Sequence, residues 1–243
     1  MTDDSVTEST LRQSNGGLHV AIIPDGNGRW AQIRGWPRPV GHRAGIEAVR
    51  RVVEAAPHLG ISTLTLFAFS SENWLRPAAE VANLMQILES YLCEAAPRAV
   101  EHDVRISVLG RRARLPGGLP GAINAAERST RAGRRLHFRL AVDYSARDEL
   151  LRAAEQLSVR RPAGREDFAC LLGPDEPAPV DFLIRTAGDL RLSDFLLWEC
   201  AYAELYFTPR LWPDFTVADF EAALADYHAR ERRFGRAPQL AVP

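Results

Sequence analysis

Short apolar runs alternate with segments of helical periodicity along most of this 243-residue chain, and this alternation limits the folds that it can adopt. The runs are rich in Val, Ile and Phe, which favour covered positions in a pleated sheet. Six runs stand out: His19–Ile23, Ile61–Phe69, Val104–Leu109, Leu136–Val142, Asp181–Arg185 and Leu205–Phe207. Strands that alternate with helices build a parallel sheet with helices on both faces. We therefore predict a single α/β domain around a central, mostly parallel six-stranded sheet.

The predicted helices follow from apolar residues three or four positions apart. We expect them over Ala44–His58, from about Ala79, over Ile123–Arg131, up to about Leu157, near Asp167–Leu172 and over Val217–Arg230. Residues Gly35–His42 are rich in Pro and Gly and are predicted to be irregular. Pro97 removes a backbone N–H and crowds the preceding turn, so the helix from about Ala79 should kink or end there.

Composition narrows the class of protein. The net charge is −1, and all 30 basic residues are Arg, so no bulk positive charge recruits nucleic acid or an anionic membrane. The cysteines Cys93, Cys170 and Cys200 lack metal-ligand spacing and indicate reduced thiols in a cytoplasmic protein. Residues 1–17 are polar, unlike a secretory signal, and are predicted to form a disordered tail before a domain over residues 18–243. No apolar run is long enough to span a bilayer.

The run from His19 to Trp30 joins a buried strand to a turn that can bind an anion. The strand stops at Pro24 and opens into Asp25-Gly26-Asn27-Gly28, and a helix can follow. Such a strand, turn and helix present backbone N–H groups to a phosphate. Asp25 would repel that phosphate unless a cation such as Mg²⁺ lay between them, and Arg29 can grip a diphosphate bidentately. Asp-Gly and Asn-Gly are also ordinary turn dipeptides, so a plain turn explains the same residues.

Two groups of cationic side chains could bind phosphate. Arg38 and His42 lie a short loop beyond it and could close over the same phosphate, although a single His is often only structural. Arg185, Arg191 and Ser193 place two guanidiniums and a hydroxyl on one loop, a set suited to a second diphosphate. Taken alone, such an Arg pair also fits a surface salt bridge.

Glu204 is a candidate second magnesium ligand, because it follows a compact apolar stretch. A solvated glutamate is the simpler interpretation of the same position. The residues alone leave this choice open.

Further blocks follow the His19–Trp30 run in a fixed order. They are Gly41-His42-Arg43-Ala44-Gly45, Phe69–Pro77, Arg185–Ser193 and Leu211-Trp212-Pro213-Asp214-Phe215. With them the chain resembles the cis-prenyltransferases, the undecaprenyl diphosphate synthase family, from His19 to Gly235. The resemblance implies a homodimeric, Mg²⁺-dependent transferase that condenses isopentenyl diphosphate with an allylic diphosphate in cis. It also implies a hydrophobic tunnel for the growing chain.

The resemblance assigns a role to each matching residue. Asp25 would bind Mg²⁺ and assist the reaction, Asn73 would be catalytic, and Glu204 would complete the metal site in the dimer. The allylic diphosphate would be held by Gly26, Asn27, Gly28, Arg29, Arg38 and His42. Isopentenyl diphosphate would be held by Arg185, Arg191 and Ser193. A mobile loop would bring Ser71, Asn73, Trp74 and Arg76 over the substrate. The remaining substrate-binding residues would be Trp30, Ser70 and Glu72. The run Arg233-Phe234-Gly235 resembles an element that reaches into the partner's site.

The chain also departs from the family pattern. Pro24 stands where Met is usual, Asp143-Tyr144-Ser145-Ala146 replaces Asn-Tyr-Gly-Gly, and Asp189 replaces Glu. Asp194 and Glu199 stand where Asn and Gln are usual. Three of these changes replace a neutral side chain by a potential anion, and they leave the substrate pair and the product open.

Alternative functions follow from these departures. A short-chain or irregular, lavandulyl-type prenyl diphosphate synthase is one, and a non-catalytic partner subunit is another. Asp25 with Arg29, Arg185 and Arg191 argues against the non-catalytic subunit. The Asp-Asp-x-x-Asp motif of trans-type synthases does not occur in the sequence, which favours the cis class.

Ala68 is the residue from which we predict product length. It lies between Phe67 and Phe69, and strand alternation predicts that it faces the side opposite both. The helix from about Ala79 should pack on one face of this strand, where the resemblance places the growing chain. A small side chain there leaves room for several additions.

Overall fold

Six strands form one sheet in which every neighbouring pair is parallel, as the sequence predicts. The computed structural model describes residues 17–159, 164–173 and 179–230. The strands are β1 (Leu18–Ile23), β2 (Ile61–Ser70), β3 (Val104–Leu109), β4 (Leu136–Tyr144), β5 (Phe182–Arg185) and β6 (Glu204–Phe207). Their order is β3-β4-β2-β1-β5-β6, so β2 and β5 flank β1 on opposite sides. A position where the strand order reverses in this way is called a topological switch point. In open parallel sheets, ligands bind beyond the carboxyl ends of the strands at that position.

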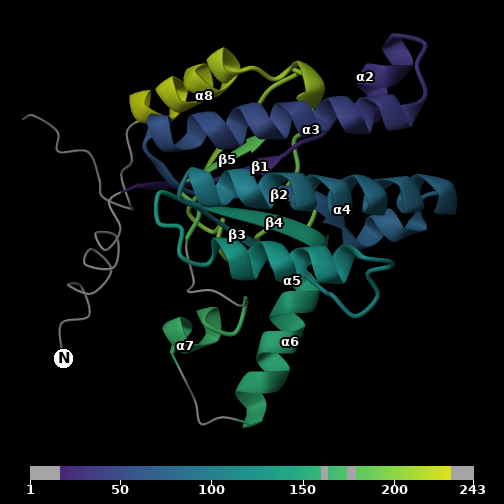
Figure 1. The fold of residues 1–243 in the computed structure, drawn as a ribbon. Helices are drawn as coiled ribbons and strands as arrows, with labels where there is room; N and C mark the ends of the chain where they lie inside the picture. The colour runs from purple at the N-terminus through teal and green to yellow at the C-terminus, as the bar shows by residue number, and fades with distance from the viewer. Residues whose placement is uncertain (1–16, 160–163, 174–178, 231–243) are drawn as a thin grey trace, which may run out of the picture.

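Four helices cover one face of the sheet (Figure 1). They lie in the order α8 (Val217–Ala229), α3 (Arg38–Ala55), α4 (Ala78–Glu101) and α5 (Leu119–Thr130). They bury one apolar cluster against strand residues such as Leu64, Leu66 and Phe138. On the other face, Phe195 and Leu196 from the connection between β5 and β6 pack in a second cluster.

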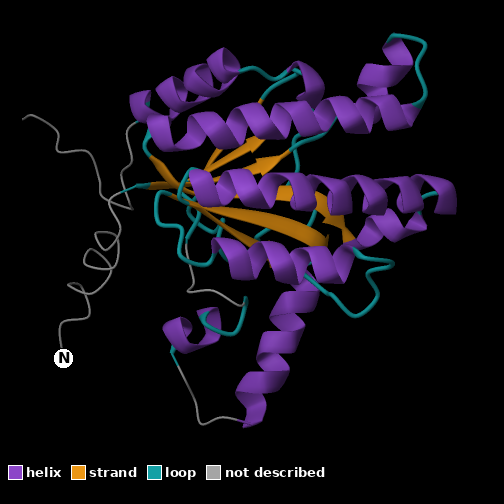
Figure 2. Cartoon of the chain, viewed as in Figure 1, coloured by secondary structure: helices purple, strands orange, loops and turns teal. Residues whose placement is uncertain are grey.

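The remaining helical segments are short or stand apart from this layer. They are α2 (Asn27–Ile33), α6 (Ala146–Val159), α7 (Arg165–Ala169) and the 3₁₀ segments η1 (Ala56–Leu59), η2 (Ser71–Leu75) and η3 (Trp212–Asp214). Figure 2 shows α6 and α7 below the four-helix layer. Within the described ranges, none of the helices combines the length and apolarity that crossing a membrane requires. The predicted tail over residues 1–17 lies outside the described residues except for Gly17. The Arg233-Phe234-Gly235 run lies beyond residue 230 and is also outside them.

Two helix boundaries differ from the sequence prediction because of where their prolines lie. Helix α3 begins at Arg38 rather than Ala44, and Pro39 occupies its first turn. The missing N–H costs nothing there, since first-turn amides have no intrahelical partner. Helix α4 does not end at Pro97 but continues to Glu101. Pro97 is exposed, so water can solvate the carbonyl group that it leaves unpaired.

Two glycines allow α2 to pack closely on α3. A Cβ atom at Gly41 would lie 2.0 Å from the backbone oxygen of Asn27, and one at Gly45 would lie 2.4 Å from the Asn27 side-chain oxygen. The indole of Trp212 donates to the Gly45 carbonyl group at 2.9 Å on the same side of α3. The Gly41–Gly45 block is therefore explained by the close approach of the first turn of α2.

Ala68 lies in a β-bulge, which breaks the predicted alternation. Phe67 pairs with Ala141 and Phe69 with Val142, so two steps along β2 match one step along β4. Phe67 packs in the cluster on one face, whereas Ala68 and Phe69 both pack in the cluster beneath α3 and α4. The prediction that Ala68 faces away from both phenylalanines is wrong for Phe69, but Ala68 does lie on the α4 side.

The close approach of α2 and α3 predicts that Gly41→Ala destabilises the protein. The added methyl group would meet a backbone oxygen that cannot rotate away, and overpacking of this kind costs about 1–3 kcal/mol. Gly121→Ala in α5 is the matched control, because nothing lies within 4 Å of its Cβ position; we expect it to be neutral or stabilising by about 0.5–1 kcal/mol. Urea unfolding measures both, and equal stability of the two variants would contradict the packing argument.

Candidate active site

The candidate site lies where four strands end. Asp25 follows β1, Ser70 ends β2, Asp143 lies at the end of β4 and Arg185 ends β5. Because these strands are parallel, their carboxyl ends meet at one edge of the sheet. The structure thus brings together most of the residues that the sequence singled out.

Arg185 is the centre of this arrangement and is almost completely buried, with 3% of its surface exposed. Its Nη2 contacts Asp25 Oδ2 at 3.0 Å and Asp189 Oδ2 at 3.2 Å. Its Nη1 donates to Ser193 Oγ at 2.7 Å and to the Arg191 carbonyl oxygen. The guanidinium of Arg185 therefore joins the Asp25 turn to the predicted set of Arg185, Arg191 and Ser193. Asp189, which also accepts from Arg191 at 2.8 Å, was not predicted as a partner in this cluster.

The turn at Asp25 is fixed by a residue that the sequence analysis missed. The backbone N–H of Asp25 donates to Thr186 Oγ1 at 2.9 Å, and that hydroxyl donates to the Asp25 carbonyl oxygen at 2.8 Å. Gly26 has φ 101°, and a Cβ atom there would lie 2.9 Å from the Ala187 side chain. Only glycine fits this left-handed position without strain. In the sequence, the sign available for this contact was the Thr that directly follows Arg185, the last residue of β5.

A second cationic cluster forms around Glu80, another residue that was not predicted. Its carboxylate contacts Arg38 Nε at 3.2 Å and Arg76 Nη1 at 3.1 Å. His42 Nε2 lies 3.8 Å from the same carboxylate. The guanidinium of Arg38 also covers Gly28, where a Cβ atom would lie 2.8 Å from Arg38 Cζ. These predicted phosphate-binding side chains thus meet on one acidic residue in the first turn of α4.

The turn after β1 lies between the two cationic clusters. Gly28 lies under Arg38 on one side. On the other side, Arg29 Nη2 lies 3.7 Å from Asp25 and 3.9 Å from Asp189. The backbone amides in the first turn of α2 have no intrahelical partner and are available to an anion.

The remaining predicted substrate residues are held by protein contacts. Trp30 donates to Asp214 Oδ1 at 2.6 Å, which ties α2 to η3. Asn73 Oδ1 accepts from the Ser70 backbone N–H at 3.1 Å. Glu72 is exposed on η2, 3.9 Å from the guanidinium of Arg147. The hydroxyl of Ser71 and the indole N–H of Trp74 both donate to the carboxylate of Asp143.

Glu204 lies at the opposite end of the sheet from Asp25. The strand register aligns Val20 with Phe182 and Phe182 with Glu204. Asp25 is therefore displaced from Glu204 by roughly 16 Å along the strand direction, at about 3.3 Å per residue. Glu204 contacts Arg230 at 3.0 Å. One copy of the chain does not bring the two predicted metal ligands together.

The donor set at Asp25 fits a metal ion that arrives with substrate. Among the described residues no group of three or more His, Cys, Asp or Glu side chains could hold a metal, so they form no all-protein cage. Asp25 and Asp189 present two carboxylates on one guanidinium. Mg²⁺ commonly takes one or two carboxylates and completes its shell with substrate phosphates and water, so these residues fit Mg²⁺.

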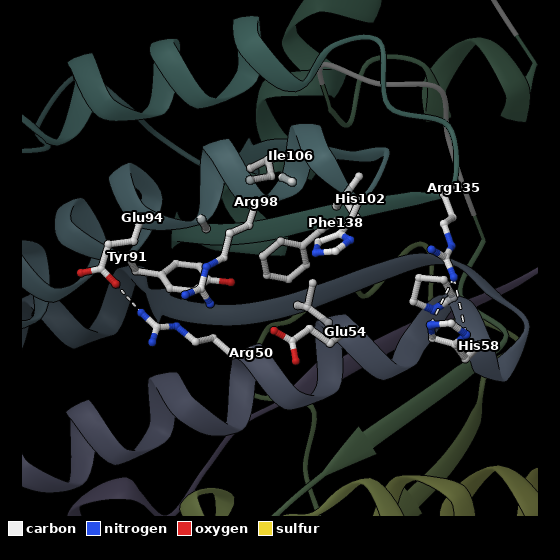
Figure 3. A pocket seen from close by; sticks show the side chains of 15 residues that line it. Arg50, Glu54, His58, Tyr91, Glu94, Arg98, His102, Ile106, Arg135 and Phe138 are labelled. Atoms are coloured by element: carbon white, nitrogen blue, oxygen red, sulfur yellow. Dashed lines mark hydrogen bonds and ion pairs between the residues drawn. The ribbon is translucent and has the colours of Figure 1, made fainter.

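A cavity of about 440 Å³ opens between α3 and α4, over the sheet (Figure 3). Tyr91, Ile106 and Phe138 supply apolar lining. Its rim is charged and includes the ion pair of Arg50 with Glu94. From His42 to Arg50 along α3, the cavity begins roughly 12 Å from the second cationic cluster, at about 1.5 Å per residue.

His42 should make stability depend on pH. Burial lowers its pKa from 6.5 to about 4, opposed by Glu80 and aided by Arg76 and Arg38. Between these values the unfolded chain binds a proton that the folded chain does not. The stability contributed by neutral His42 is therefore complete above pH 6.5 and is lost as the pH falls toward 4, by up to about 3 kcal/mol. Urea unfolding of wild type and His42→Gln at pH 4.5 and 7 measures this, and equal pH slopes would contradict it.

Known proteins share both the sequence and the fold. Residues 23–235 match the family model described as Putative undecaprenyl diphosphate synthase. Isoprenyl transferase 1 of Bradyrhizobium diazoefficiens is 54% identical over 229 residues, which cover 94% of this chain and 93% of that protein.

Two solved structures show the same fold. The crystal structure of lavandulyl diphosphate synthase from Lavandula x intermedia, in complex with dimethylallyl diphosphate, has a TM-score of 0.86 at 39% identity and covers 89% of this chain and 97% of that one. That of a probable undecaprenyl diphosphate synthase from Campylobacter jejuni has a TM-score of 0.78 at 33% identity and covers 92% and 100%. The family model spans most of the chain and the relatives match nearly its whole length, so this chain belongs to the undecaprenyl diphosphate synthase family and is an isoprenyl transferase.

Proposed function

We propose that this site performs a Mg²⁺-dependent cis condensation of isopentenyl diphosphate with an allylic diphosphate. The observation that carries the proposal is the position of the Asp25–Arg29 turn between two cationic clusters. One cluster contains Arg185 and Arg191, and the other contains Arg38 and His42. Two diphosphates on either side of one carboxylate are what the reaction requires.

The allylic diphosphate binds at the cluster around Arg38, His42 and Arg76. In the reaction the allylic C–O bond ionises, and negative charge grows on the departing diphosphate. Arg29 and Arg38 stabilise this charge where it develops, together with the first-turn amides of α2. When bound, Mg²⁺ neutralises part of the diphosphate charge and polarises its oxygens.

Isopentenyl diphosphate binds at Arg185, Arg191 and Ser193. Its alkene attacks the allylic carbon, and a base then removes a proton to set the cis double bond. Asp25 is the carboxylate between the two subsites and the candidate for assisting this step. Asn73 has its side-chain oxygen engaged by Ser70, so its amide NH₂ is the group that can contact substrate.

The apolar tail of the product runs between α3 and α4 in this proposal. Ala68 packs in the cluster beneath these helices, where its small side chain would leave room for that tail. The 440 Å³ cavity lies farther along the same two helices. A continuous apolar passage from Ala68 to this cavity would favour repeated additions over a single condensation.

A homodimer would supply the second metal ligand. Because Glu204 lies at the far end of the sheet from Asp25 in one copy, a shared ion requires Glu204 from a second copy. Magnesium sites built from one carboxylate per subunit would depend on that assembly. We propose a cytoplasmic homodimer with this arrangement.

Loss of the Asp25 carboxylate should abolish turnover without unfolding the protein. We expect Asp25→Asn to lower kcat by roughly a hundred- to a thousandfold, the usual effect of removing a key electrostatic group. Turnover is measured with labelled isopentenyl diphosphate, Mg²⁺ and dimethylallyl, geranyl or farnesyl diphosphate, with products sized by chromatography. Wild-type activity in a chelator, or full activity of the folded variant, would overturn the assignment.

Mixing two inactive variants tests the shared site. Asp25→Ala and Glu204→Ala are each expected to be inactive as homodimers. Coexpressed, they should recover about a quarter of wild-type activity, because half of randomly formed dimers are mixed and each holds one intact site. No recovery in dimers shown to be mixed would mean that the two residues serve the same site from one chain. An active Glu204→Ala homodimer would mean that Glu204 is not a ligand.

A further inference from the structure

The carboxylate of Asp143 is completely buried at the end of β4, although it can carry a charge. Its exposed fraction is 0%. Its backbone adopts φ 52°, a left-handed conformation that Asp and Asn tolerate better than other non-glycine residues. A buried carboxylate of this kind persists only where partners compensate its charge.

Four side chains from two separate segments surround this carboxylate. Arg114 binds it bidentately, with Nε at 2.7 Å from Oδ2 and Nη2 at 2.6 Å from Oδ1. Arg111 Nη2 lies 3.3 Å from Oδ1. From η2, Trp74 Nε1 donates at 2.9 Å and Ser71 Oγ at 3.1 Å. One carboxylate thus joins η2 to the connection between β3 and α5.

The indole of Trp74 has contacts on several sides. Its N–H binds Asp143, its ring meets Phe69 edge to face at 5.3 Å, and the guanidinium of Arg114 lies over the ring at 4.9 Å. Arg114 therefore contacts both the indole and the carboxylate that binds it. We call Asp143, Arg114 and Trp74 the β4 latch.

The backbone brings the Arg111–Arg114 segment to this position independently of the side chains. The Arg111 N–H donates to the Asp143 carbonyl oxygen at 3.2 Å. A Cβ atom at Gly110 would lie 2.2 Å from the Val142 carbonyl oxygen, so glycine permits this approach. The latch is therefore built on two strand ends that are fixed to each other.

The charge of the latch is balanced. Burial alone would raise the pKa of Asp143, but hydrogen bonds from Arg114, Trp74 and Arg111 lower it below its usual value. The carboxylate stays ionised at neutral pH. On its outer side, Arg111 also pairs with Asp148 at 2.8 Å.

Segment η2, which the latch holds in place, leads directly into the second cationic cluster. Arg76 follows η2 immediately, and its guanidinium lies 3.1 Å from Glu80, which also holds Arg38. The position of η2 therefore sets where Arg76 stands relative to Arg38. A mobile η2 would leave only part of the population with these side chains assembled.

We propose that Asp143 is a positioning residue: through Arg114 and Trp74 it holds η2 in the conformation that binds the allylic diphosphate. The inference rests on the proposed function for the identity of that ligand. The latch itself is present before substrate binds and does not depend on the proposed function. Asp143 acts on the reaction only through η2 and touches no reacting atom.

The test compares variants of two latch residues with a variant of a neighbouring arginine outside the latch. Asp143→Asn removes the charge while keeping a side chain that tolerates a left-handed backbone, and Arg114→Ala removes the exposed side of the latch with little risk to folding. Arg112→Ala is the matched control. Arg112 lies between Arg111 and Arg114 in sequence, but it pairs with Glu127 of α5 at 2.6 Å. Urea unfolding of each protein confirms that it is folded.

Fluorescence reads the latch without substrate. Each protein is measured with Trp74 and with Trp74→Phe, and the difference gives the emission of Trp74. We expect a red shift and stronger acrylamide quenching of Trp74 in both latch variants, and neither change in Arg112→Ala. Addition of an allylic diphosphate should reverse the shift, because the ligand orders η2 again.

Kinetics reads the consequence for the site. If the binding-competent conformation falls to about a tenth of the population, the apparent KM for the allylic diphosphate rises about tenfold. The KM for isopentenyl diphosphate should stay within about twofold, since no hydrogen bond or ion pair found among the described residues joins Arg185 or Ser193 to the latch. Arg112→Ala should change neither constant.

The outcomes separate the latch from the function on which it rests. An unchanged Trp74 signal in both folded latch variants would overturn the latch whatever the enzyme does. A shifted Trp74 with both KM values unchanged, or with both raised equally, would overturn the positioning role while leaving the proposed function intact. A wild type that turns over no pair of diphosphates would overturn the proposed function, and the role of Asp143 with it, even where the fluorescence arm succeeds.

Discussion

The site depends on the parallel pairing of β1 with β5, which aligns Ile23 with Arg185. Both strands end at this level, so Asp25 and the buried guanidinium meet at 3.0 Å just beyond the sheet. The hydroxyl of Thr186, one residue past the strand, accepts from the backbone N–H of Asp25 and donates to its carbonyl oxygen. A one-residue slip in this pairing would turn Arg185 to the other face of the sheet. The register of two buried strands therefore sets the position of Asp25 relative to Arg185 in the candidate site.

Three of the four acidic residues among the departures from the family pattern are compensated within the protein: Asp143, Asp189 and Asp194. Asp143 binds Arg114 bidentately, and Asp189 lies between Arg185 and Arg191. Asp194 accepts from the first-turn N–H of Arg147 in α6 and from Ser145 Oγ at 2.6 Å. These carboxylates therefore add no uncompensated negative charge that would repel a diphosphate. They anchor the loops that carry the proposed binding residues.

The sequence predicted features that depend on local pattern and missed those that depend on distant partners. The six strands follow from apolar runs, and the turn at Asp25 follows from the glycines after the first of these runs. Glu80 and Thr186 gave little signal, because each acts through residues far away in the chain. The bulge at Ala68 was invisible for a related reason: it depends on pairing with β4, which no property of β2 alone reveals. Helix ends shifted wherever a proline occupied a tolerated position, as in α3 and α4.

The arginines of the second cationic cluster are already paired in the free protein, and this affects which anions the cluster selects. Arg38 and Arg76 share the carboxylate of Glu80, which offsets the repulsion of holding two guanidiniums together. A ligand must therefore exchange with this carboxylate rather than meet free charges. A ligand with a single negative charge gains little from such an exchange, whereas a diphosphate presents more charge and several acceptor oxygens to the same forks. Because the side chains are assembled beforehand, little ordering cost is added on binding. The neutral state of His42 fits the same logic, since a third cation in this buried position would raise the repulsion that Glu80 alone must offset.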